Sequence, residues 1–376
     1  MNNSINLLIK PTHKCNLNCE YCYEKEARNF YGDKTLRIEA LDKLLNVFTK
    51  QYKNINIIWH GGEPLLAGED WYNKAYNVIE KYKDNNVIKC SMQSNGILYD
   101  EYKDMIEKYN IDYSISYDYI NNNSIRCFNQ NLNPKIQNLH INTISVIDLN
   151  SIDKIIEQYE FNKDNFINNS MNHIFIPSDI DLNELRHYIE KYKEFLTHVF
   201  FDYKNIDNYE ERMSINYFKI VLGYKSVLCE HKECLTDFYC LDVDENVYHC
   251  DRFSNNNYVF CNINDIDYVT DIYNTDGFKK FKMQHLNIKK ECQSNCEIFS
   301  LCNGGCIANR IIVNENMRLN NSDCLFIRSI LLHCFELVKN IKDIASINPV
   351  IYRLMWKKGY VSLDDCSKLE YEGELW

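Results

Sequence analysis

The sequence predicts an α/β protein in which a mainly parallel sheet is followed by a smaller, cysteine-rich domain. In the first half, short apolar segments alternate with segments whose apolar residues recur at helical spacing, as in parallel βα units. Six strands can be counted in this way. After Lys225 the helical spacing is lost, and cysteines recur every few residues up to Cys324. Such density is typical of a domain that bound metal stabilises in place of a large apolar core.

The predicted strands are short apolar runs, several of which end at a proline, glycine or polar turn. They are Ile5–Lys10, Ile55–His60, Val87–Gln93, Tyr113–Tyr117, Leu139–Ile147 and His173–Ile176. Apolar residues three or four apart predict helices over Leu36–Tyr52, Trp71–Lys83, Tyr99–Tyr109, Ile152–Phe161, most of Leu182–Val227, and Phe326–Ile341. These elements suggest a domain over residues 1–227, a second over 228–340 and a tail over 341–376.

The composition indicates a metalloprotein of a reducing compartment. The 376 residues are 45% hydrophobic and 25% charged, which is ordinary for a globular protein. A formal charge of −11 argues against a general nucleic-acid surface. The start of the chain lacks the features of a signal peptide, and no apolar run approaches the roughly 20 residues of a membrane span. Because the 17 cysteines are odd in number and clustered, we expect metal ligands in a cytoplasmic protein, with neither membrane nor nucleic acid as partner.

A first cysteine cluster directly follows the first predicted strand. Cys15, Cys19 and Cys22 stand at C-x3-C-x2-C spacing. Three thiolates can hold three irons of a [4Fe-4S] cluster and leave the fourth iron open to a substrate or cofactor. In a βα barrel, the loops at the carboxyl ends of the strands build the active site. On spacing alone, the alternative is a zinc site completed by a distant Cys or His.

This spacing, together with the aromatic Tyr23, resembles the radical S-adenosylmethionine (radical SAM) superfamily. Three further motifs match that family in chain order, at the ends of the second, third and fourth predicted strands. They are Gly61-Gly62-Glu63-Pro64, Ser94-Asn95-Gly96 and Ser116-Tyr117-Asp118. On its own, the Gly61-Gly62-Glu63-Pro64 segment indicates only a turn. The resemblance rests on finding the three motifs together in this order. The sequence departs from the family at Tyr119, where a glycine usually follows the aspartate.

The resemblance implies how S-adenosylmethionine would be held. The Gly61-Gly62-Glu63 segment would receive its ammonium group, Ser94 and Asn95 would line the pocket, and Ser116 and Asp118 would reach the ribose. An arginine also meets the carboxylate in some relatives. The implied cofactor-binding residues are therefore Tyr23, Gly61, Gly62, Glu63, Ser94, Asn95, Ser116, Asp118 and Arg126. For Arg126, a solvated loop position is the alternative.

Eight later cysteines form a second group that resembles the SPASM extension of peptide-modifying radical SAM enzymes. Eight thiolates suffice for two complete [4Fe-4S] clusters, although two or three zinc sites are the alternative on cysteine density alone. The resemblance implies an inner set (Cys229, Cys234, Cys250 and Cys306) and an outer set (Cys292, Cys296, Cys302 and Cys324).

The group departs from the family at Glu245, where a glycine is usual, and at Cys292-x3-Cys296, where two intervening residues are usual. Cys240 is an alternative to Cys234, but it lies in an apparent strand, Phe238–Val243. We therefore expect a buried role for it.

Asp251, which follows Cys250, is the candidate catalytic residue. In the anaerobic sulfatase maturases a matching aspartate is thought to take a proton from the substrate residue. Oxidation of a side chain releases a proton, so a carboxylate beside an electron-accepting cluster suits that chemistry. The alternative is that Asp251 only caps its loop.

Over residues 5–340, the resemblance implies a partial (β/α)6 TIM-like barrel with a C-terminal iron–sulfur SPASM domain. The implied enzyme contains three [4Fe-4S] clusters, takes electrons from reduced flavodoxin or ferredoxin, and cleaves S-adenosylmethionine to a 5′-deoxyadenosyl radical that acts on a peptide or protein. The preferred hypothesis is the formation of a thioether or carbon–carbon cross-link in a ribosomally made peptide, although the segment before Cys15 is too short for a leader-recognition domain. The alternative is formylglycine formation from Cys or Ser in a sulfatase. Outside this class, an iron–sulfur electron carrier and a zinc scaffold are the competing hypotheses.

Overall fold

The computed structural model divides into two compact units that are each discontinuous in sequence. It describes residues 3–118, 141–174, 176–177, 179–202, 204–205, 209–226, 228–231, 234–253, 258–310, 322–341 and 346–360. The first unit comprises residues 1–144 and 233–291, and the second comprises residues 145–232 and 292–376. This division groups the chain differently from the predicted domains, which stay a prediction.

Parallel strands that pair in chain order form most of the sheet in the first unit. They are β1 (Ser4–Thr12), β2 (Asn54–Gly61), β3 (Val87–Ser94), β4 (Asp112–Ser116) and the start of β5 (Asn142–Ile147). On the other side of β1 lies the parallel strand β8 (Phe238–Leu241), followed by the antiparallel strands β9 (Asn246–Tyr248) and β10 (Cys261–Asn262). The strand order is linear, so the sheet is open. The carboxyl ends of β1 to β4 meet at one edge, where the predicted motifs lie.

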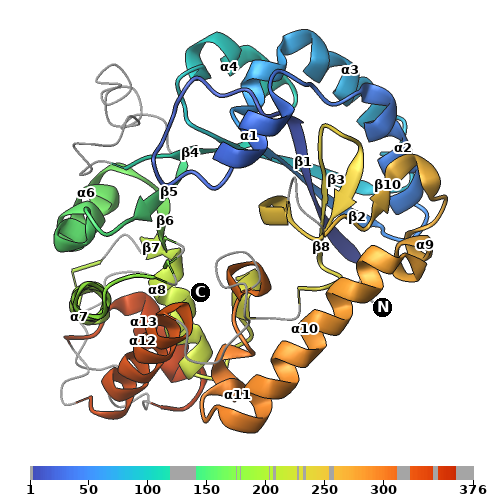
Figure 1. Cartoon of the computed structure of the whole chain (residues 1–376). Helices are drawn as coiled ribbons and strands as arrows, with labels where there is room; N and C mark the ends of the chain where they lie inside the picture. The colour runs from blue at the N-terminus through green and yellow to red at the C-terminus, as the bar shows by residue number, and fades with distance from the viewer. Residues whose placement is uncertain are drawn as a thin grey trace. The chain divides into compact units, whose positions relative to one another are not determined.

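Helices of the first unit flank these strands. They are α1 (Lys25–Tyr31), α2 (Ile38–Phe48), α3 (Glu69–Glu80), α4 (Tyr99–Lys108), α9 (Val269–Asn274) and most of α10 (Asp276–Asn295), with short 3-10 helices at Pro64–Ala67, Asp251–Phe253 and Ile263–Asp265. Figure 1 shows α2, α3 and α4 along the outer side of the strands. The helical spacing that predicted α2 reappears as its buried face, since Leu41, Leu44, Leu45 and Phe48 are all buried.

The second unit packs helices and two further strands around an aromatic core. Its strands are the end of β5, β6 (Asn168–His173) and β7 (Glu210–Glu211), and β6 pairs with β7 in parallel. Its helices are α6 (Ile155–Asn165), α7 (Leu182–Phe200), α8 (Arg212–Val221), α11 (Phe299–Cys302), α12 (Ser322–Lys339) and α13 (Pro349–Lys357), with 3-10 helices at Ile152–Lys154 and Cys229–His231. Tyr188, Tyr192 and Phe326 pack together in the core of this unit.

The predicted α/β fold with a mainly parallel, unclosed sheet is confirmed. Several short elements were not predicted, and two larger differences have a clear physical reason. The sixth strand is Asn168–His173 and not His173–Ile176. Its residues are mostly polar, and they are accommodated by hydrogen bonds such as the one from Asn169 Nδ2 to Ser145 Oγ (3.2 Å). The apolar run that suggested a strand instead follows β6, where Ile176 is buried.

The second difference is α10, a helix of 20 residues in the region where the sequence analysis found no helical spacing. A stripe was present in the sequence at spacings of three and four residues, and its members are all buried: Phe278, Phe281, His285, Ile288 and Cys292. The histidine and the cysteine in this stripe obscured it.

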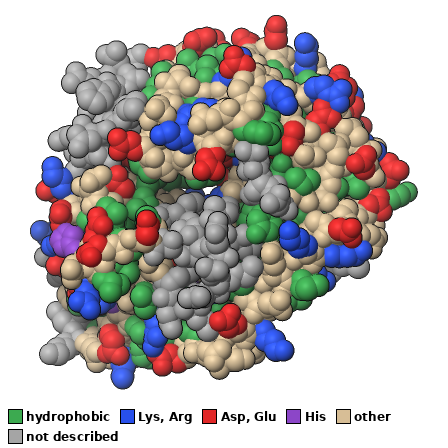
Figure 2. All heavy atoms as spheres, viewed as in Figure 1, with side chains coloured by type: hydrophobic (Ala, Val, Ile, Leu, Met, Phe, Trp, Pro, Cys, Tyr) green, Lys and Arg blue, Asp and Glu red, His purple; other side chains and the backbone are tan. Residues whose placement is uncertain are grey.

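Surface properties agree with the composition. In the described part of the chain, no helix combines the length and apolar character needed to cross a bilayer. On the face shown in Figure 2, lysine and arginine side chains of the described residues are interspersed with aspartate and glutamate.

Candidate active site

The loop after β1 holds the first three cysteines in one compact turn. Cys15, Cys19 and Cys22 are all free thiols. The backbone N–H of Cys22 donates to the carbonyl of Cys19 (3.3 Å), and that of Leu17 donates to Cys15 Sγ (3.5 Å). Arg28 Nη1 donates to the carbonyl of Leu17 (2.8 Å) and ties the turn to α1. The sequence therefore forms a closed loop with its thiols kept together.

Burial and nearby charges shift the pKa of two of these thiols. Burial raises the pKa of the Cys15 and Cys22 thiols, and Cys19 raises both further, while Arg28 opposes the shift. A metal would therefore have to displace protons from the loop, as thiolate ligands require. Three adjacent thiols, which are the ligands that iron–sulfur clusters take, fit a [4Fe-4S] cluster with one open iron.

The Gly61-Gly62-Glu63 turn at the end of β2 packs directly on the backbone that leads into the cysteine loop. The N–H of Gly62 donates to the carbonyl of Thr12 (3.1 Å), and that of Glu63 donates to the carbonyl of Lys14 (2.7 Å). A Cβ on Gly62 would overlap the carbonyl oxygens of His13 and Lys14. Only glycine lets these two strand ends approach so closely.

Glu63 joins the ends of β2 and β3 below the cysteine loop. Its carboxylate is fully buried and accepts hydrogen bonds from Ser94 Oγ (3.0 and 3.1 Å), the N–H of Asn95 (2.8 Å) and the N–H of Leu65 (3.2 Å). The Asn95 side chain in turn donates to Asn16 Oδ1 (2.7 Å) in the cysteine loop. The predicted residues Glu63, Ser94 and Asn95 thus form one network with that loop. Their contacts with a cofactor stay a prediction.

Replacing Glu63 with glutamine should destabilise this network. The amide would place an NH₂ group against N–H and O–H donors in a buried site, leaving at least one of them unsatisfied. An unsatisfied buried donor costs about 1–3 kcal/mol. We expect a loss of that size in the free energy of unfolding, measured by denaturant titration. Glu80→Gln on α3, where the Glu80 side chain is largely exposed, is the matched control and should change stability by less than about 0.5 kcal/mol.

The end of β4 also reaches the cysteine loop. Asp118 is buried, and its carboxylate accepts a hydrogen bond from the Tyr21 hydroxyl. Ser116 Oγ accepts from Gln93 Nε2 of β3 (2.8 Å). Four consecutive strand ends therefore meet at this edge. The predicted Arg126 and the departing position Tyr119 lie outside the described residues.

Asp251 belongs to the same unit and is held at three points. The Tyr23 hydroxyl donates to its carboxylate, and Lys10 Nζ donates to its backbone carbonyl (2.7 Å). His60 Nδ1 lies 3.9 Å from Asp251 Oδ2. Burial alone would raise the pKa of Asp251, but the charges of His60, Lys10 and Arg252 and the bond from Tyr23 outweigh it, so this pKa lies below its usual value. The carboxylate is therefore ionised at neutral pH.

A buried charged network behind Asp251 was missed by the sequence analysis. Lys10 is fully buried and pairs with Glu24, and its Nζ lies 3.8 Å from Asp242. His13 lies between the same two carboxylates, 3.2 Å from Glu24 and 2.6 Å from Asp242. Burial alone would lower the pKa of His13, but the hydrogen bonds to Asp242 and Glu24 raise it above the usual value. One signal for this network was present in the sequence, because Lys10 and His13 stand at the end of an apolar strand.

Cys234, Cys240 and Cys250 lie in the first unit. Cys240 is fully buried in β8, as predicted, and burial raises the pKa of its thiol strongly. Cys234 Sγ lies 3.4 Å from His249 Nε2, and Cys250 precedes the turn of Asp251. The choice of Cys234 over Cys240 as a ligand stays a prediction.

In the second unit, the cysteines of the predicted outer set come together. Burial raises the pKa of the Cys292 thiol, the guanidinium of Arg310 lowers it, and Cys302 and Cys324 raise it. Arg310 Nη1 donates to Cys292 Sγ (3.1 Å). Cys296 lies one helical turn after Cys292, and its N–H donates to the carbonyl of Cys292 (2.9 Å). Cys229 and Cys306 also belong to this unit, and the inner ligand set stays a prediction.

Comparison with known families decides the class of the protein. Residues 9–140 match the family model of the radical SAM superfamily. That range contains the cysteine loop and all three further motifs. The chain contains a radical SAM domain. The family implies that the cluster held by the cysteine loop is an iron–sulfur cluster that works with S-adenosylmethionine.

Curated relatives and solved structures resemble this radical SAM enzyme over most of its length. The cysteine-type anaerobic sulfatase-maturating enzyme of Clostridium novyi (strain NT) is 27% identical over 366 residues, covering 87% of this chain and 93% of the relative. The structure of polyhistidine-tagged anSMEcpe with bound AdoMet superposes with a TM-score of 0.76 at 21% identity, covering 90% of this chain and 98% of that one. The structure of native anSMEcpe with bound AdoMet and the Cp18Cys peptide has the same identity and coverage, with a TM-score of 0.75. These structural matches establish the fold of this enzyme.

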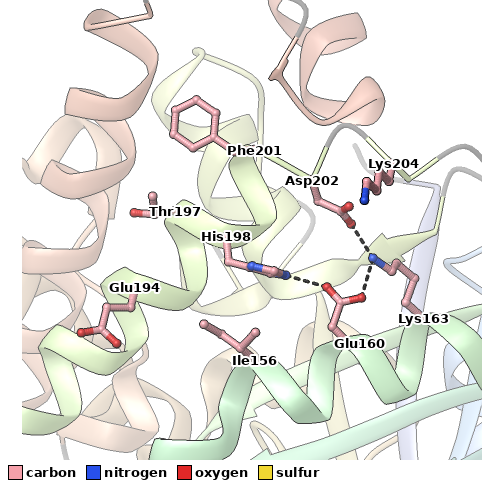
Figure 3. A pocket seen from close by; sticks show the side chains of 9 residues that line it. All are labelled: Ile156, Glu160, Lys163, Glu194, Thr197, His198, Phe201, Asp202 and Lys204. Carbon is pink, nitrogen blue, oxygen red and sulfur yellow. Dashed lines mark hydrogen bonds and ion pairs between the residues drawn. The ribbon is translucent and has the colours of Figure 1, made fainter.

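A surface pocket of about 620 Å³ lies elsewhere, between α6 and α7 of the second unit (Figure 3). None of the motif residues lines it. Four of its ionisable side chains pair with one another, since Glu160 bonds His198 (2.6 Å) and Lys163 (2.7 Å), and Lys163 bonds Asp202 (3.0 Å). These pairs satisfy one another without a ligand, and the pocket is not part of the radical SAM site.

Proposed function

We propose that this enzyme oxidises a cysteine or serine side chain of a peptide or protein to formylglycine. The observation that carries the proposal is the hydrogen bond from Tyr23 to the carboxylate of Asp251. Because Tyr23 directly follows Cys22, this bond holds the carboxylate of Asp251 beside the cysteine loop, which supports its assignment as the proton acceptor. The similarity to sulfatase-maturating relatives supports the same reaction. It favours formylglycine formation over the cross-linking that the sequence analysis preferred.

Different residues of the first unit have different roles in the proposed reaction. Cys15, Cys19 and Cys22 would hold the cluster, which with S-adenosylmethionine supplies the radical that removes a hydrogen atom from the substrate. Asp251 accepts the proton that the oxidised side chain releases, with Tyr23 and Lys10 fixing its position. The close packing of the Gly62 turn and the buried Glu63 network keep the strand ends in place, which matters because a displacement of about 1 Å can cost 10²-fold in rate.

The proposal includes further cofactors and partners. Oxidation of an alcohol to an aldehyde removes two electrons, and so does oxidation of a thiol to a thioaldehyde, which water then hydrolyses to the aldehyde and hydrogen sulfide. The radical takes one of these electrons with its hydrogen atom, so a second acceptor is needed. We assign that role to two auxiliary [4Fe-4S] clusters on the predicted inner and outer cysteine sets. Peptide is the expected substrate class because the related anSMEcpe was crystallised with peptides. Reduced flavodoxin or ferredoxin is the expected electron donor.

A peptide panel tests the proposed reaction. Anaerobically reconstituted enzyme is incubated with S-adenosylmethionine, a strong reductant, and peptides that present Cys or Ser in a sulfatase-type context. We expect a new aldehyde, detected by its adduct with a hydrazine and located by mass spectrometry. A thioether or carbon–carbon cross-link with no aldehyde would overturn formylglycine formation and restore the other hypothesis. Cofactor cleavage without any change in any peptide would show that the substrate class is wrong.

Replacing Asp251 with asparagine tests the proton acceptor. Asparagine keeps the shape of the side chain but accepts a proton poorly, and general-base catalysis typically contributes 10²–10⁴-fold. We therefore expect peptide oxidation to slow by about 10²-fold or more, while cleavage of S-adenosylmethionine continues. Both products are measured in the same reaction. Asp267→Asn, a substitution at an exposed position of the same unit, is the control and should leave both unchanged. A D251N enzyme that oxidises peptide within a factor of about three of the parent would remove Asp251 from the mechanism.

A further inference from the structure

Arg310 is a buried cation in contact with one of the later cysteines. Its side chain is 5% exposed, and its Nη1 donates to Cys292 Sγ at 3.1 Å. Burying a guanidinium without an anionic partner is costly, and a thiolate is an anionic partner. Cys292 and Arg310 are 18 residues apart, so the tertiary fold brings them together.

The same guanidinium lies near a second cysteine of the predicted outer set. Gly305, at φ +69°, lies between them, and a Cβ built on it would be 3.8 Å from both Arg310 Nε and Cys302 Sγ. Arg310 therefore lies beside two thiols of the predicted outer set, Cys292 and Cys302.

We propose that Arg310 raises the reduction potential of the iron–sulfur cluster that Cys292, Cys302 and Cys324 help to hold. This inference rests on the presence of that auxiliary cluster in the proposed function and adds a specific role for one residue. A reduced cluster has one more negative charge than an oxidised one, so a nearby cation that donates to a ligand sulfur favours the reduced form. The effect is strong where water is excluded, because the effective dielectric constant is low.

The functional consequence is a direction for electron flow. A cluster that is easier to reduce is a better acceptor for the electron that substrate oxidation releases. Arg310 thus makes the auxiliary cluster of the second unit a favourable acceptor for that electron. A purely structural arginine would hold the loop together without changing the potential, which makes the two roles separable.

Redox titration of arginine variants tests this role. Replacing Cys15, Cys19 and Cys22 with alanine in the full-length protein removes the radical SAM cluster. Electron paramagnetic resonance then reports only the auxiliary clusters. In this background, R310M should keep its iron. The reduction equilibrium of one cluster should become about tenfold less favourable, which lowers its midpoint potential by about 59 mV for one electron. R310K should shift it less, because lysine keeps the charge but loses the planar fork.

The control is R328M, which removes an arginine from the same unit. Arg328 is partly exposed on α12 and pairs with Glu297. The R328M variant should leave every midpoint potential unchanged. Should R310M fail to assemble clusters, R310K and R310Q decide the question, since both keep a polar side chain. A cluster with full iron content and parental potentials in R310M, or in both R310K and R310Q, overturns the proposal. These potentials are measured without substrate, so the outcome is independent of whether the enzyme makes formylglycine.

Discussion

Replacing Gly62 with alanine is expected to lower cleavage of S-adenosylmethionine by about 10²-fold or more. The added methyl group would overlap the backbone carbonyl oxygens of His13 and Lys14, and backbone cannot move aside as a flexible side chain can. The turn after β2 would therefore shift away from the cysteine loop. A shift of about 1 Å in a positioned site typically costs 10²-fold, and forcing extra volume into packed structure costs about 1–3 kcal/mol in stability.

The measurement is the amount of 5′-deoxyadenosine formed per enzyme, alongside iron content and thermal unfolding. Gly32→Ala in the same unit is the matched control, because a Cβ there meets nothing within 4 Å. It has a positive φ of 58°, so we expect a stability loss of about 1 kcal/mol without loss of cofactor cleavage. Should G62A cleave the cofactor as fast as G32A does, the close packing of the two strand ends is not needed for activity.

Replacing Cys19 with alanine is expected to abolish cofactor cleavage and to remove about four irons from each chain. Cys19 is 5% exposed, and its charge raises the pKa of both other thiols of the loop. The three thiolates already leave one iron of the cluster without a protein ligand. The two thiolates that remain in the variant are too few to hold the cluster. The outcome is read by iron and sulfide analysis and by the optical spectrum of anaerobically reconstituted protein.

Cys90→Ala provides the control for Cys19→Ala. Cys90 is a buried cysteine of β3 in the same unit, and burial raises the pKa of its thiol to about 11, so it is protonated and a poor ligand. We expect this variant to keep the parental iron content and activity, with a modest loss of stability from the lost side chain. Equal iron content in the two variants would mean that Cys19 is not a ligand, and the interpretation of the loop would fail.

The position of the site was predictable because the motifs follow strands. Parallel strands present their carboxyl ends at one edge, so motifs that end successive strands must meet there. The hydrogen bonds from the Gly62 and Glu63 N–H groups to the residues before Cys15 confirm this for β1 and β2. The buried carboxylate of Glu63, which accepts from Ser94 and Asn95, confirms it for β3.

The departure from the family at Glu245 has a structural explanation that the sequence alone did not provide. Glu245 has a φ of +67°, in the left-handed region that favours glycine. Its carboxylate accepts from Arg37 Nη2 (2.7 Å) and Asn264 Nδ2 (2.7 Å). These bonds offset the cost of the backbone conformation. They also show why a non-glycine residue is tolerated at that turn.

Local patterns in the sequence determined the first five parallel strands, most helices between them, the cysteine loop and the motifs at the strand ends, because each depends on residues that are close along the chain. The tertiary structure alone decided which distant charges meet. Lys10 and His13 meet Asp242 more than 200 residues later, and Arg310 meets Cys292 across a loop. No periodicity encodes such pairs, since a buried charge is stable only where folding supplies a partner.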